Sequence, residues 1–517
     1  MWLELKKNTS IKTMTHSKTT VRISIIISYI VITFLLVHGI AALIHYVNTG
    51  ADRSKMLHIE LQQKEQYIPK LSWKIEGKKG RSMNDQTISD IKKDYLKAWY
   101  VRHIAYQTNE AMGLDDYYTK SAKKNIINTI NQNKLENIHV AETTLEHHIN
   151  IEYFSEDGAL VVLTDTNVLE YKRIYKDNAF QLENYERATY KVILLFEDGF
   201  WRIRHLIREE SAAVELHHTP RFHSKVHLKG INYYPQKTPW NLFGVHYNTS
   251  IIATDFATIK SAGLNSIRIF IPYRSFQNSK AHAQQLKKLK QLLDTAQKHQ
   301  IKVMITLFDF YGDYTVLNWT LAEKHATTVV SQLKDHPALL AWDIKNEPDL
   351  DFESRGKMVV TSWLKRMLFV VKSIDNKHPV TIGWSNAKSA VILSDEVDLV
   401  SFHYYEKPAD FKMTLEALQQ QVSNKQIILT EFGLSSYKGV WNLFTGSEIA
   451  QENYYKTMQQ LLRKEKTSFM SWTLYDFNSI PKEVVGVLPW RRNTQAYYGF
   501  IAADGRKKNS FKYISSD

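Results

Sequence analysis

Two glutamates draw attention because each directly follows an apolar run and sits in a short motif. Glu347 lies in an Asn-Glu-Pro sequence after the run 339–345, and Glu431 lies in a Glu-Phe-Gly sequence after the run 426–430. A pair of carboxyl groups can cleave a glycosidic bond when one protonates the leaving oxygen and the other attacks the anomeric carbon. An isolated Asn-Glu-Pro is a weak signal, so the pair has meaning only if the fold brings both glutamates together.

The elements that must position this pair begin at about residue 226, where β-rich and helical runs start to alternate. The predicted strands are 227–233, 266–271, 302–307, 339–345, 380–384, 399–403, 426–430 and 468–474. The predicted helices between them include 253–262, 283–299, 322–334, 357–374, 415–422 and 449–465. Eight such units fit a (β/α)8 TIM barrel, whose active site gathers at the C-terminal ends of the strands. Glu347 and Glu431, after the fourth and seventh strands, would then face one another across the barrel mouth.

In this arrangement the residues resemble the clan A glycoside hydrolases, most closely glycoside hydrolase family 5, the cellulases and mannanases. The resemblance covers about 226–517. It implies a retaining glycosidase that works by double displacement, with Glu347 as the acid/base and Glu431 as the nucleophile. The two carboxyl groups should then lie about 5 to 5.5 Å apart. Such a mechanism needs no metal and no organic cofactor.

The resemblance also implies five substrate-binding residues around the two glutamates. Arg268, on the second strand, matches the arginine that holds the nucleophile ionised, and Asn346 matches the amide that binds the sugar 2-hydroxyl. His403 and Tyr405 match a His-x-Tyr motif after the sixth strand, and Tyr405 is expected to bond the nucleophile. Trp472 on the eighth strand matches the aromatic platform under the reacting sugar.

One position departs from the family pattern. The family usually has a histidine after the third strand that touches the bound sugar, whereas this chain reads Leu-Phe-Asp-Phe-Tyr over 307–311. Asp309 and Tyr311 are the candidates to replace it. The departure bears on the sugar contacts and leaves the two glutamates untouched.

Several of these side chains also have a structural interpretation. Arg268 could be an ion-pair partner, His403 a core imidazole and Trp472 ordinary core packing, while Asp343 is expected to be structural. Four further tryptophans follow barrel strands where a long glycan would pass, and two of them are expected to form subsites: Trp319, Trp384, Trp441 and Trp490.

A smaller α+β domain is predicted over about 90–210. Ser89 can cap a helix, a second helical run covers about 115–131, and alternating runs at 148–154, 159–164, 188–196 and 199–206 have strand periodicity. The order of elements resembles the nuclear transport factor 2 (NTF2)-like cone, a resemblance of pattern only. His147 and His148 are neighbours on one strand and face opposite sides, so joint metal binding is not expected.

The N-terminal region predicts a membrane anchor. Residues 23–47 carry no charge apart from two histidines, and about 20 such residues span a bilayer as a helix. The basic segment 1–22 favours a cytoplasmic N-terminus with the catalytic domain on the extracytoplasmic side. Ala41 and Ala42 keep a cleaved signal peptide as the alternative. The polar stretch 48–89 is predicted to be a linker.

Composition narrows the classes of function. The chain has 517 residues and a formal net charge of +14, but the excess is scattered, so a nucleic-acid partner is not expected. The absence of cysteine excludes thiolate metal sites, iron–sulfur clusters and cysteine nucleophiles.

The sequence therefore predicts a membrane-anchored retaining glycosidase acting on a β-linked oligo- or polysaccharide. Two alternatives stay open: a transglycosylase, or a non-catalytic glycan-binding or assembly protein. The α+β domain is the candidate for a protein partner or for self-association.

Overall fold

The computed structural model describes residues 18–48, 67–75, 79–215, 227–276, 279–422, 425–439, 446–485 and 488–515. By their internal contacts they form two units, divided between Asp52 and Arg53. Most of the expected cytoplasmic segment 1–22 and residues 49–66 and 76–78 of the expected linker lie outside the described residues.

The first unit contains helix α1 (Lys18–Asn48), which covers the predicted membrane anchor. Within the described part of the chain, no helix combines the length and the apolar character needed to cross a bilayer. The predictions of a transmembrane anchor and of a catalytic domain on the extracytoplasmic side are therefore wrong. The prediction had rested on the lack of charge over 23–47, apart from two histidines, and on its richness in Ile, Leu and Val.

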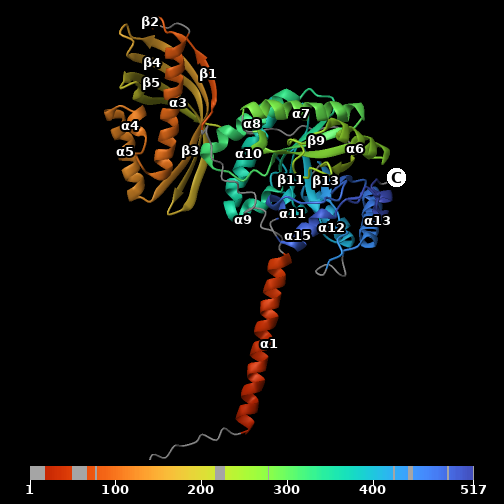
Figure 1. Cartoon of the computed structure of the whole chain (residues 1–517). Coiled ribbons are helices and arrows are strands. Elements are labelled where there is room, and N and C mark those ends of the chain that lie inside the picture. Colours follow the sequence, from red (N-terminus) through yellow and green to blue (C-terminus); the bar gives the residue numbers. More distant parts are fainter. Residues whose placement is uncertain are drawn as a thin grey trace, which may run out of the picture. The chain divides into compact units, whose positions relative to one another are not determined.

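The second unit contains a closed barrel of eight parallel strands, as predicted (Figure 1). The strands are β7 (Lys229–Asn232), β8 (Ser266–Pro272), β9 (Lys302–Asp309), β10 (Leu339–Asn346), β11 (Val380–Trp384), β12 (Leu399–Tyr404), β13 (Gln426–Phe432) and β14 (Ser468–Ser471). β14 pairs with β7 and closes the ring. Parallel pairing places the C-terminal ends of all eight strands at one rim.

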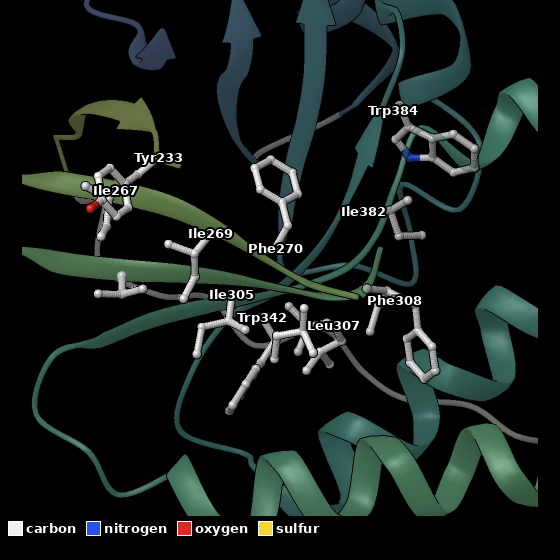
Figure 2. Close-up of a cluster of buried hydrophobic side chains, with 14 of the residues drawn as sticks. Tyr233, Ile267, Ile269, Phe270, Ile305, Leu307, Phe308, Trp342, Ile382 and Trp384 are labelled. Atoms are coloured by element: carbon white, nitrogen blue, oxygen red, sulfur yellow. The ribbon is translucent and has the colours of Figure 1, made fainter. Parts of the chain in front are cut away.

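Helices surround this barrel (Figure 1). They include α6 (Thr249–Ser261), α7 (Ser279–Lys298), α8 (Trp319–Leu333), α10 (Lys357–Ile374), α12 (Phe411–Gln421) and α13 (Glu448–Lys464). Short helices α9 (Phe352–Arg355), α11 (Ala387–Ala390), α14 (Lys482–Val485) and α15 (Pro489–Ala496) lie in the connections. Alternate strand residues such as Ile267, Ile269, Ile305 and Trp342 are buried in the main apolar core (Figure 2). This burial, at roughly 25 cal/mol per Å² of apolar surface, is the main driving force for closing the barrel.

The remaining strand residues, which alternate with those of the outer core, point into the barrel interior. Their polarity changes from one end of the strands to the other. Near the N-terminal ends they are apolar, and Met304, Ala341, Ile428 and Met470 form a separate buried cluster. Near the C-terminal ends they are polar and include Arg268, Asp343 and Glu431, all of them buried. The barrel thus has an apolar floor and a buried polar rim.

The second unit also contains the predicted α+β fold. Helices α3 (Asp85–Thr108), α4 (Leu114–Tyr117) and α5 (Lys120–Leu135) precede four long antiparallel strands. These are β3 (Ile138–Phe154), β4 (Leu160–Lys176), β5 (Ala179–Glu197) and β6 (Phe200–Ala213). Two short strands from the expected linker, β1 (Lys70–Lys74) and β2 (Lys79–Gly80), pair in parallel with β3. The likeness to an NTF2-like cone stays a prediction.

Local details differ from the sequence-based boundaries of this domain. Helix α3 begins four residues before Ser89, because Asn84 caps it by accepting a hydrogen bond from the Thr87 amide at 2.7 Å. His147 is fully buried and contacts Asp165 Oδ2 through Nδ1 at 2.6 Å, whereas the neighbouring His148 is partly exposed. The two histidine side chains therefore lie in different environments, as their neighbouring positions on one strand predicted.

The long sheet packs against barrel helices through aromatic and polar contacts. Tyr171 of β4 stacks on Trp319 of α8 with 4.3 Å between ring centroids. Ser362 of α10 donates to Glu183 of β5 at 2.8 Å. Tyr171 belongs to the same buried cluster as the outer core of the barrel. The α+β domain thus packs against α8 and α10 of the barrel.

Candidate active site

The two glutamates meet at the C-terminal rim of the barrel. Glu347 directly follows β10, and Glu431 lies near the end of β13. A carboxylate oxygen of each, together with a ring nitrogen of His403, lies within 4.8 Å of the others, and all three side chains are buried. This separation fits the short distance of a retaining pair rather than the roughly 6.5 to 9.5 Å that an inverting pair needs.

Arg268 lies beneath Glu431 and uses all five of its N–H groups within the protein. Nη1 donates to Glu431 Oε2 at 3.3 Å and to Asn232 Oδ1 at 3.2 Å. Nη2 donates to Asp343 Oδ2 at 2.6 Å and to Asn346 Oδ1 at 2.9 Å, and Nε donates to Asp343 Oδ2 at 3.0 Å. Burial alone would lower the pKa of Arg268, but the charges of Asp343 and Glu431 raise it. The guanidinium is therefore a fixed positive charge with no donor left for a ligand.

Asp343 anchors this arginine from the opposite side. Its Oδ2 also accepts from Thr306 Oγ1 at 2.7 Å, and its Oδ1 accepts from the Gly383 amide at 2.8 Å. A Cβ atom at Gly383 would lie 2.5 Å from Arg268 Nη2, so this strand position admits only glycine without displacing the guanidinium. Asp343 is thus structural, as expected, and its role is to orient Arg268.

Tyr405 and His403 complete the contacts of the two glutamates. The Tyr405 hydroxyl donates to Glu431 Oε1 at 2.6 Å. The Tyr405 ring is 42% exposed, but its hydroxyl is enclosed, and burial together with the charge of Glu431 raises the Tyr405 pKa well above its usual range. His403 Nδ1 lies 2.9 Å from Glu347 Oε1 and 3.8 Å from Glu431 Oε2. His403 is therefore a link between the glutamates rather than an isolated core imidazole.

A cavity that is open to solvent lies above these groups. It is lined by Tyr234, Trp240, Phe270, Asp309, Phe310, Asn346, Glu347, Glu431, Trp472, Glu483, Val484 and Gln495. Trp472 forms an aromatic wall with Trp240, whose ring centroid lies 5.7 Å away. Aromatic faces beside a few polar groups are suited to a sugar, which has apolar C–H faces and polar hydroxyl edges.

Of the two candidates after the third strand, only Asp309 reaches this cavity. Tyr311 is buried and stacks on Trp363 with 4.6 Å between ring centroids. Asp309 lines the cavity and accepts a long hydrogen bond of 3.4 Å from the Tyr234 hydroxyl. Burial raises the pKa of Asp309 to about 6, in spite of the opposing charges of Lys345 and Arg268.

Part of the cavity lining has a strained backbone. Three lining residues other than glycine have a positive φ: Trp240 at 55°, Phe310 at 55° and Glu347 at 46°. This left-handed conformation costs free energy for L-residues with a side chain and is held only where the surroundings determine it. Among the three strained residues is Glu347, one of the two glutamates of the site.

The predicted tryptophan subsites are only partly described. Trp319 and Trp384 are fully buried, so neither offers a face to a glycan, and Trp319 packs on the α+β sheet instead. Trp441 and the side chain of Trp490 lie outside the described residues. Trp240, which the sequence analysis did not consider, is the tryptophan that joins Trp472 at the cavity.

Glu347, His403 and Glu431 could also offer ligand atoms to a metal ion. The Arg268 guanidinium, 3.3 Å from Glu431, repels a cation at that position, and Tyr405 already occupies Oε1 of the same carboxylate. The donor set is therefore better suited to proton transfer and nucleophilic attack than to holding a metal.

Sequence reasoning missed the residues that reach the cavity from outside the strand-end motifs. Tyr234 follows β7 and lines the cavity, and Asn232, the last residue of β7, accepts a hydrogen bond from Arg268. Both could have been found by asking what faces Arg268 across the barrel. Glu483, Val484 and Gln495 come from the long connection after β14, which has no periodic pattern to place it.

Relatives of known name match only parts of this chain. A mannan endo-1,4-beta-mannosidase of Arabidopsis thaliana is 26% identical over 24% of the chain and 40% of its own length. A mannan endo-1,4-beta-mannosidase of Aspergillus clavatus is 29% identical over 19% of the chain and 26% of its own length. A beta-glucuronidase of Chlorocebus aethiops is 28% identical over 31% of the chain and 26% of its own length. The matches thus span well under half of these relatives.

Solved structures also align with the chain. An exo-beta-1,4-mannosidase from Opitutaceae bacterium strain TAV5 covers 56% of the chain, and the match covers 58% of that structure, with 16% identity and a TM-score of 0.47. The family described as Cellulase (glycosyl hydrolase family 5) matches residues 228–478, which include β7 to β14 and both glutamates. Residues 228–478 therefore belong to glycosyl hydrolase family 5.

Proposed function

We propose that this protein is a retaining β-glycosidase that cleaves a β-linked glycan by double displacement. The proposal rests above all on the pairing of Glu347 with Glu431, since one carboxylate oxygen of each lies within 4.8 Å of the other and both residues line the cavity. The family to which 228–478 belongs supports the same class of reaction.

In the first step, Glu431 attacks the anomeric carbon of the bound sugar. Arg268 and Tyr405 each donate a hydrogen bond to the Glu431 carboxylate, and these two bonds hold it in place for the attack. Glu347 gives its proton to the glycosidic oxygen as that bond breaks, so the leaving sugar departs as an alcohol. The product of this step is a neutral glycosyl ester on Glu431 and a carboxylate at Glu347.

In the second step, Glu347 takes a proton from a water molecule, which attacks the same carbon and releases Glu431. His403, 2.9 Å from Glu347, stabilises the charge of that carboxylate between the two steps. Two inversions at one carbon give net retention of configuration. A sugar hydroxyl in place of water would give transglycosylation by the same residues.

Asn346 and Trp472 are proposed to position the sugar. Asn346 accepts from Arg268 through Oδ1, which fixes the amide so that its nitrogen is available to a sugar 2-hydroxyl. Trp472 lines the cavity and can stack on a pyranose ring. Since two relatives are named as mannan endo-1,4-beta-mannosidases, β-1,4-mannan is the first polysaccharide to test.

The test measures release of reducing ends by the full chain from β-mannan, β-glucan and xylan, with Glu431→Gln as the matched control. Release that disappears in Glu431→Gln supports the proposal. Equal release by both proteins would contradict it. Glycan binding without release, even when acceptor sugars are added, would favour a non-catalytic binding protein.

A further inference from the structure

The turn that carries Glu347 is closed by a buried ion pair. Lys345 comes before Glu347 near the end of β10, and Asp351 comes after it as the last residue of the short turn η3 (Pro348–Asp351). Lys345 Nζ lies 3.3 Å from Asp351 Oδ2, and both side chains are almost fully inaccessible to solvent. Inside the turn, the Leu350 amide donates to the Glu347 carbonyl at 3.2 Å. The ion pair therefore ties together the two ends of the segment that carries the proposed acid.

Glu347 depends on such a closure because its backbone is strained. Its φ of 46° and ψ of 52° lie in the left-handed region. That conformation costs an L-residue free energy and persists only where the surrounding structure determines it. Lys345 and Asp351 are not among the residues that line the cavity, and no step of the proposed mechanism uses either of them. Any effect of this pair on the reaction therefore acts through the position of Glu347.

Tyr314 holds Asp351 from a different segment of the chain. Its hydroxyl donates to Asp351 Oδ2, the same oxygen that faces Lys345. Burial, together with the charge of Asp351, raises the pKa of Tyr314 well above its usual range, so the hydroxyl keeps its proton and stays a donor. The Tyr314 ring packs edge-on against Trp363, with 5.4 Å between ring centroids. Asp351 is thus fixed by one cation and one well-oriented hydroxyl.

The same tyrosine is held by α8, the helix on which the α+β domain packs. Trp319 Nε1 donates to the Tyr314 carbonyl at 3.2 Å. The Trp319 ring stacks on Tyr171 of β4, with 4.3 Å between ring centroids. The Tyr171 hydroxyl is itself fixed, because it donates to Glu183 Oε2 at 2.5 Å. Contacts between buried side chains therefore lead from the α+β sheet to the turn of Glu347.

We propose that Asp351 is a positioning residue that holds Glu347 in the geometry of a general acid. The α+β domain takes part in this positioning through Tyr171, Trp319 and Tyr314. The inference rests on the proposed glycosidase function, in which Glu347 protonates the leaving oxygen. It gives the α+β domain a part in the reaction itself, beyond that of a surface for partners.

The test uses the dependence of acid catalysis on the leaving group. Mannohexaose has a sugar leaving group that needs a proton, whereas dinitrophenyl β-mannobioside has a leaving group that departs as an anion. Cellohexaose and dinitrophenyl β-cellobioside form a second pair for a site of the other configuration. The kcat/KM of the hexaose measures formation of the glycosyl ester with acid assistance. Pre-steady-state release of dinitrophenol by the full chain measures the same step without it.

Tyr314→Phe removes the hydrogen bond to Asp351 and keeps the packed ring. We expect kcat/KM for the hexaose to fall by about 10- to 100-fold, since misplacing a catalytic group by about 1 Å costs about 10²-fold. Dinitrophenol release should slow by less than about 3-fold, because that step needs no acid. Asp351→Asn should give the same pattern. The control Tyr118→Phe removes a buried hydroxyl that donates to the Ala98 carbonyl at 2.9 Å, away from these contacts, and should change neither rate.

A double-mutant cycle tests the part of the α+β domain. Tyr171→Leu removes the ring that stacks on Trp319, and Trp319→Phe keeps an aromatic ring on Tyr171 but removes the Nε1 donor. Each should lower kcat/KM for the hexaose by about 2- to 30-fold, the range of couplings through packed side chains. Added to Tyr314→Phe, either substitution should lower it no further, because both act through Tyr314.

Two results would overturn the inference. One is an equal change of rate on both substrates of a pair, including no change on either, in Tyr314→Phe and Asp351→Asn chains that are folded by circular dichroism. The other is a fully additive cycle, which would remove the α+β domain from the positioning of Glu347. A wild-type chain that hydrolyses no member of either pair would contradict the glycosidase proposal, whereas an active wild-type chain with either of the first two results contradicts the inference alone.

Discussion

Arg268 Nη1 donates to Glu431 Oε2 at 3.3 Å, and this is one of five hydrogen bonds that saturate the guanidinium. The arginine therefore cannot move toward a ligand without breaking contacts with Asn232, Asp343 or Asn346. Its position fixes both the charge beside the proposed nucleophile and the amide beside the proposed acid. Most of the site is thus organised before any sugar enters.

Gly383→Ala tests this organisation without touching a glutamate. The added Cβ would lie 2.5 Å from Arg268 Nη2 and 3.1 Å from Asp343 Oδ2, so the guanidinium must shift. We expect kcat to fall by about 10-fold or more, since misplacing catalytic groups by a fraction of an ångström is costly. A steady-state assay measures kcat with the polysaccharide that the wild-type chain hydrolyses in the reducing-end test. Gly505→Ala, where no atom lies within 4 Å of the added Cβ, controls for the substitution itself, although its positive φ should lower stability slightly. An unchanged kcat in Gly383→Ala would contradict the argument.

Tyr405→Phe removes one hydrogen bond to Glu431. Because a bond to a charged group contributes about 1.5 to 3 kcal/mol, kcat/KM should fall by about 10- to 150-fold. Stability should change by less than about 1 kcal/mol in urea unfolding, since the Tyr405 ring is partly exposed and remains in place. A large loss of stability with intact activity would show that the hydroxyl is structural instead.

Glu347→Gln should have an effect that depends on the leaving group. General acid catalysis contributes about 10²- to 10⁴-fold where the departing oxygen needs a proton. A dinitrophenyl leaving group needs none, so formation of the glycosyl ester from a dinitrophenyl glycoside should be affected much less than cleavage of an alkyl glycoside. Pre-steady-state release of dinitrophenol measures that first step. An equal loss of rate on both substrates would contradict the role of Glu347 as the general acid.

The charge of Asp309 should make stability depend on pH. Burial raises its pKa to about 6 from a usual value of 3.8, so the folded state favours the protonated carboxyl. The protonated Asp309 carboxyl contributes its full stabilisation of the folded state below about pH 4, and this contribution is lost as pH rises through about 6. Tyr234, Lys345 and Arg268 are the groups that act on the Asp309 carboxyl. The shift corresponds to about 2 to 3 kcal/mol at neutral pH.

Asp309→Asn should therefore be more stable than wild type at pH 7.5, with the difference shrinking toward pH 5. Urea unfolding of both chains across this pH range measures the difference in the free energy of unfolding. Asp313→Asn, which changes a carboxylate outside the cavity lining, is the control. If Asp309→Asn is less stable than wild type at pH 7.5, the buried charge is better compensated than its surroundings indicate.

The barrel could be predicted from sequence because its strands are short apolar runs at regular spacing, and both glutamates directly follow such runs. The long strands β3 and β4 were only half recognised. Their faces bury polar residues such as Glu142, His147, Asp165 and Arg173, which break the alternation on which strand prediction depends. Asn346, His403 and Tyr405 were found through motifs, and the structure brings them to the glutamates.

What the sequence could not place depends on tertiary packing. Asp309 and Tyr311 are two residues apart in one connection, and only the packing of Tyr311 on Trp363 shows which of them faces the cavity. Glu483 and Gln495 come from an aperiodic connection after β14. The anchor prediction at 23–47 was wrong, because a count of apolar residues does not by itself establish a membrane span.

The central claim is that Glu431 carries the sugar during turnover. A 2-deoxy-2-fluoro glycoside with a dinitrophenyl leaving group slows both steps but leaves the first one faster, so the ester accumulates. Peptide mass mapping of the full chain after this treatment should find one fluoroglycosyl group on Glu431 and none in Glu431→Gln. Turnover of the parent glycoside with inverted configuration at the anomeric carbon, or a label on another residue, would contradict the account.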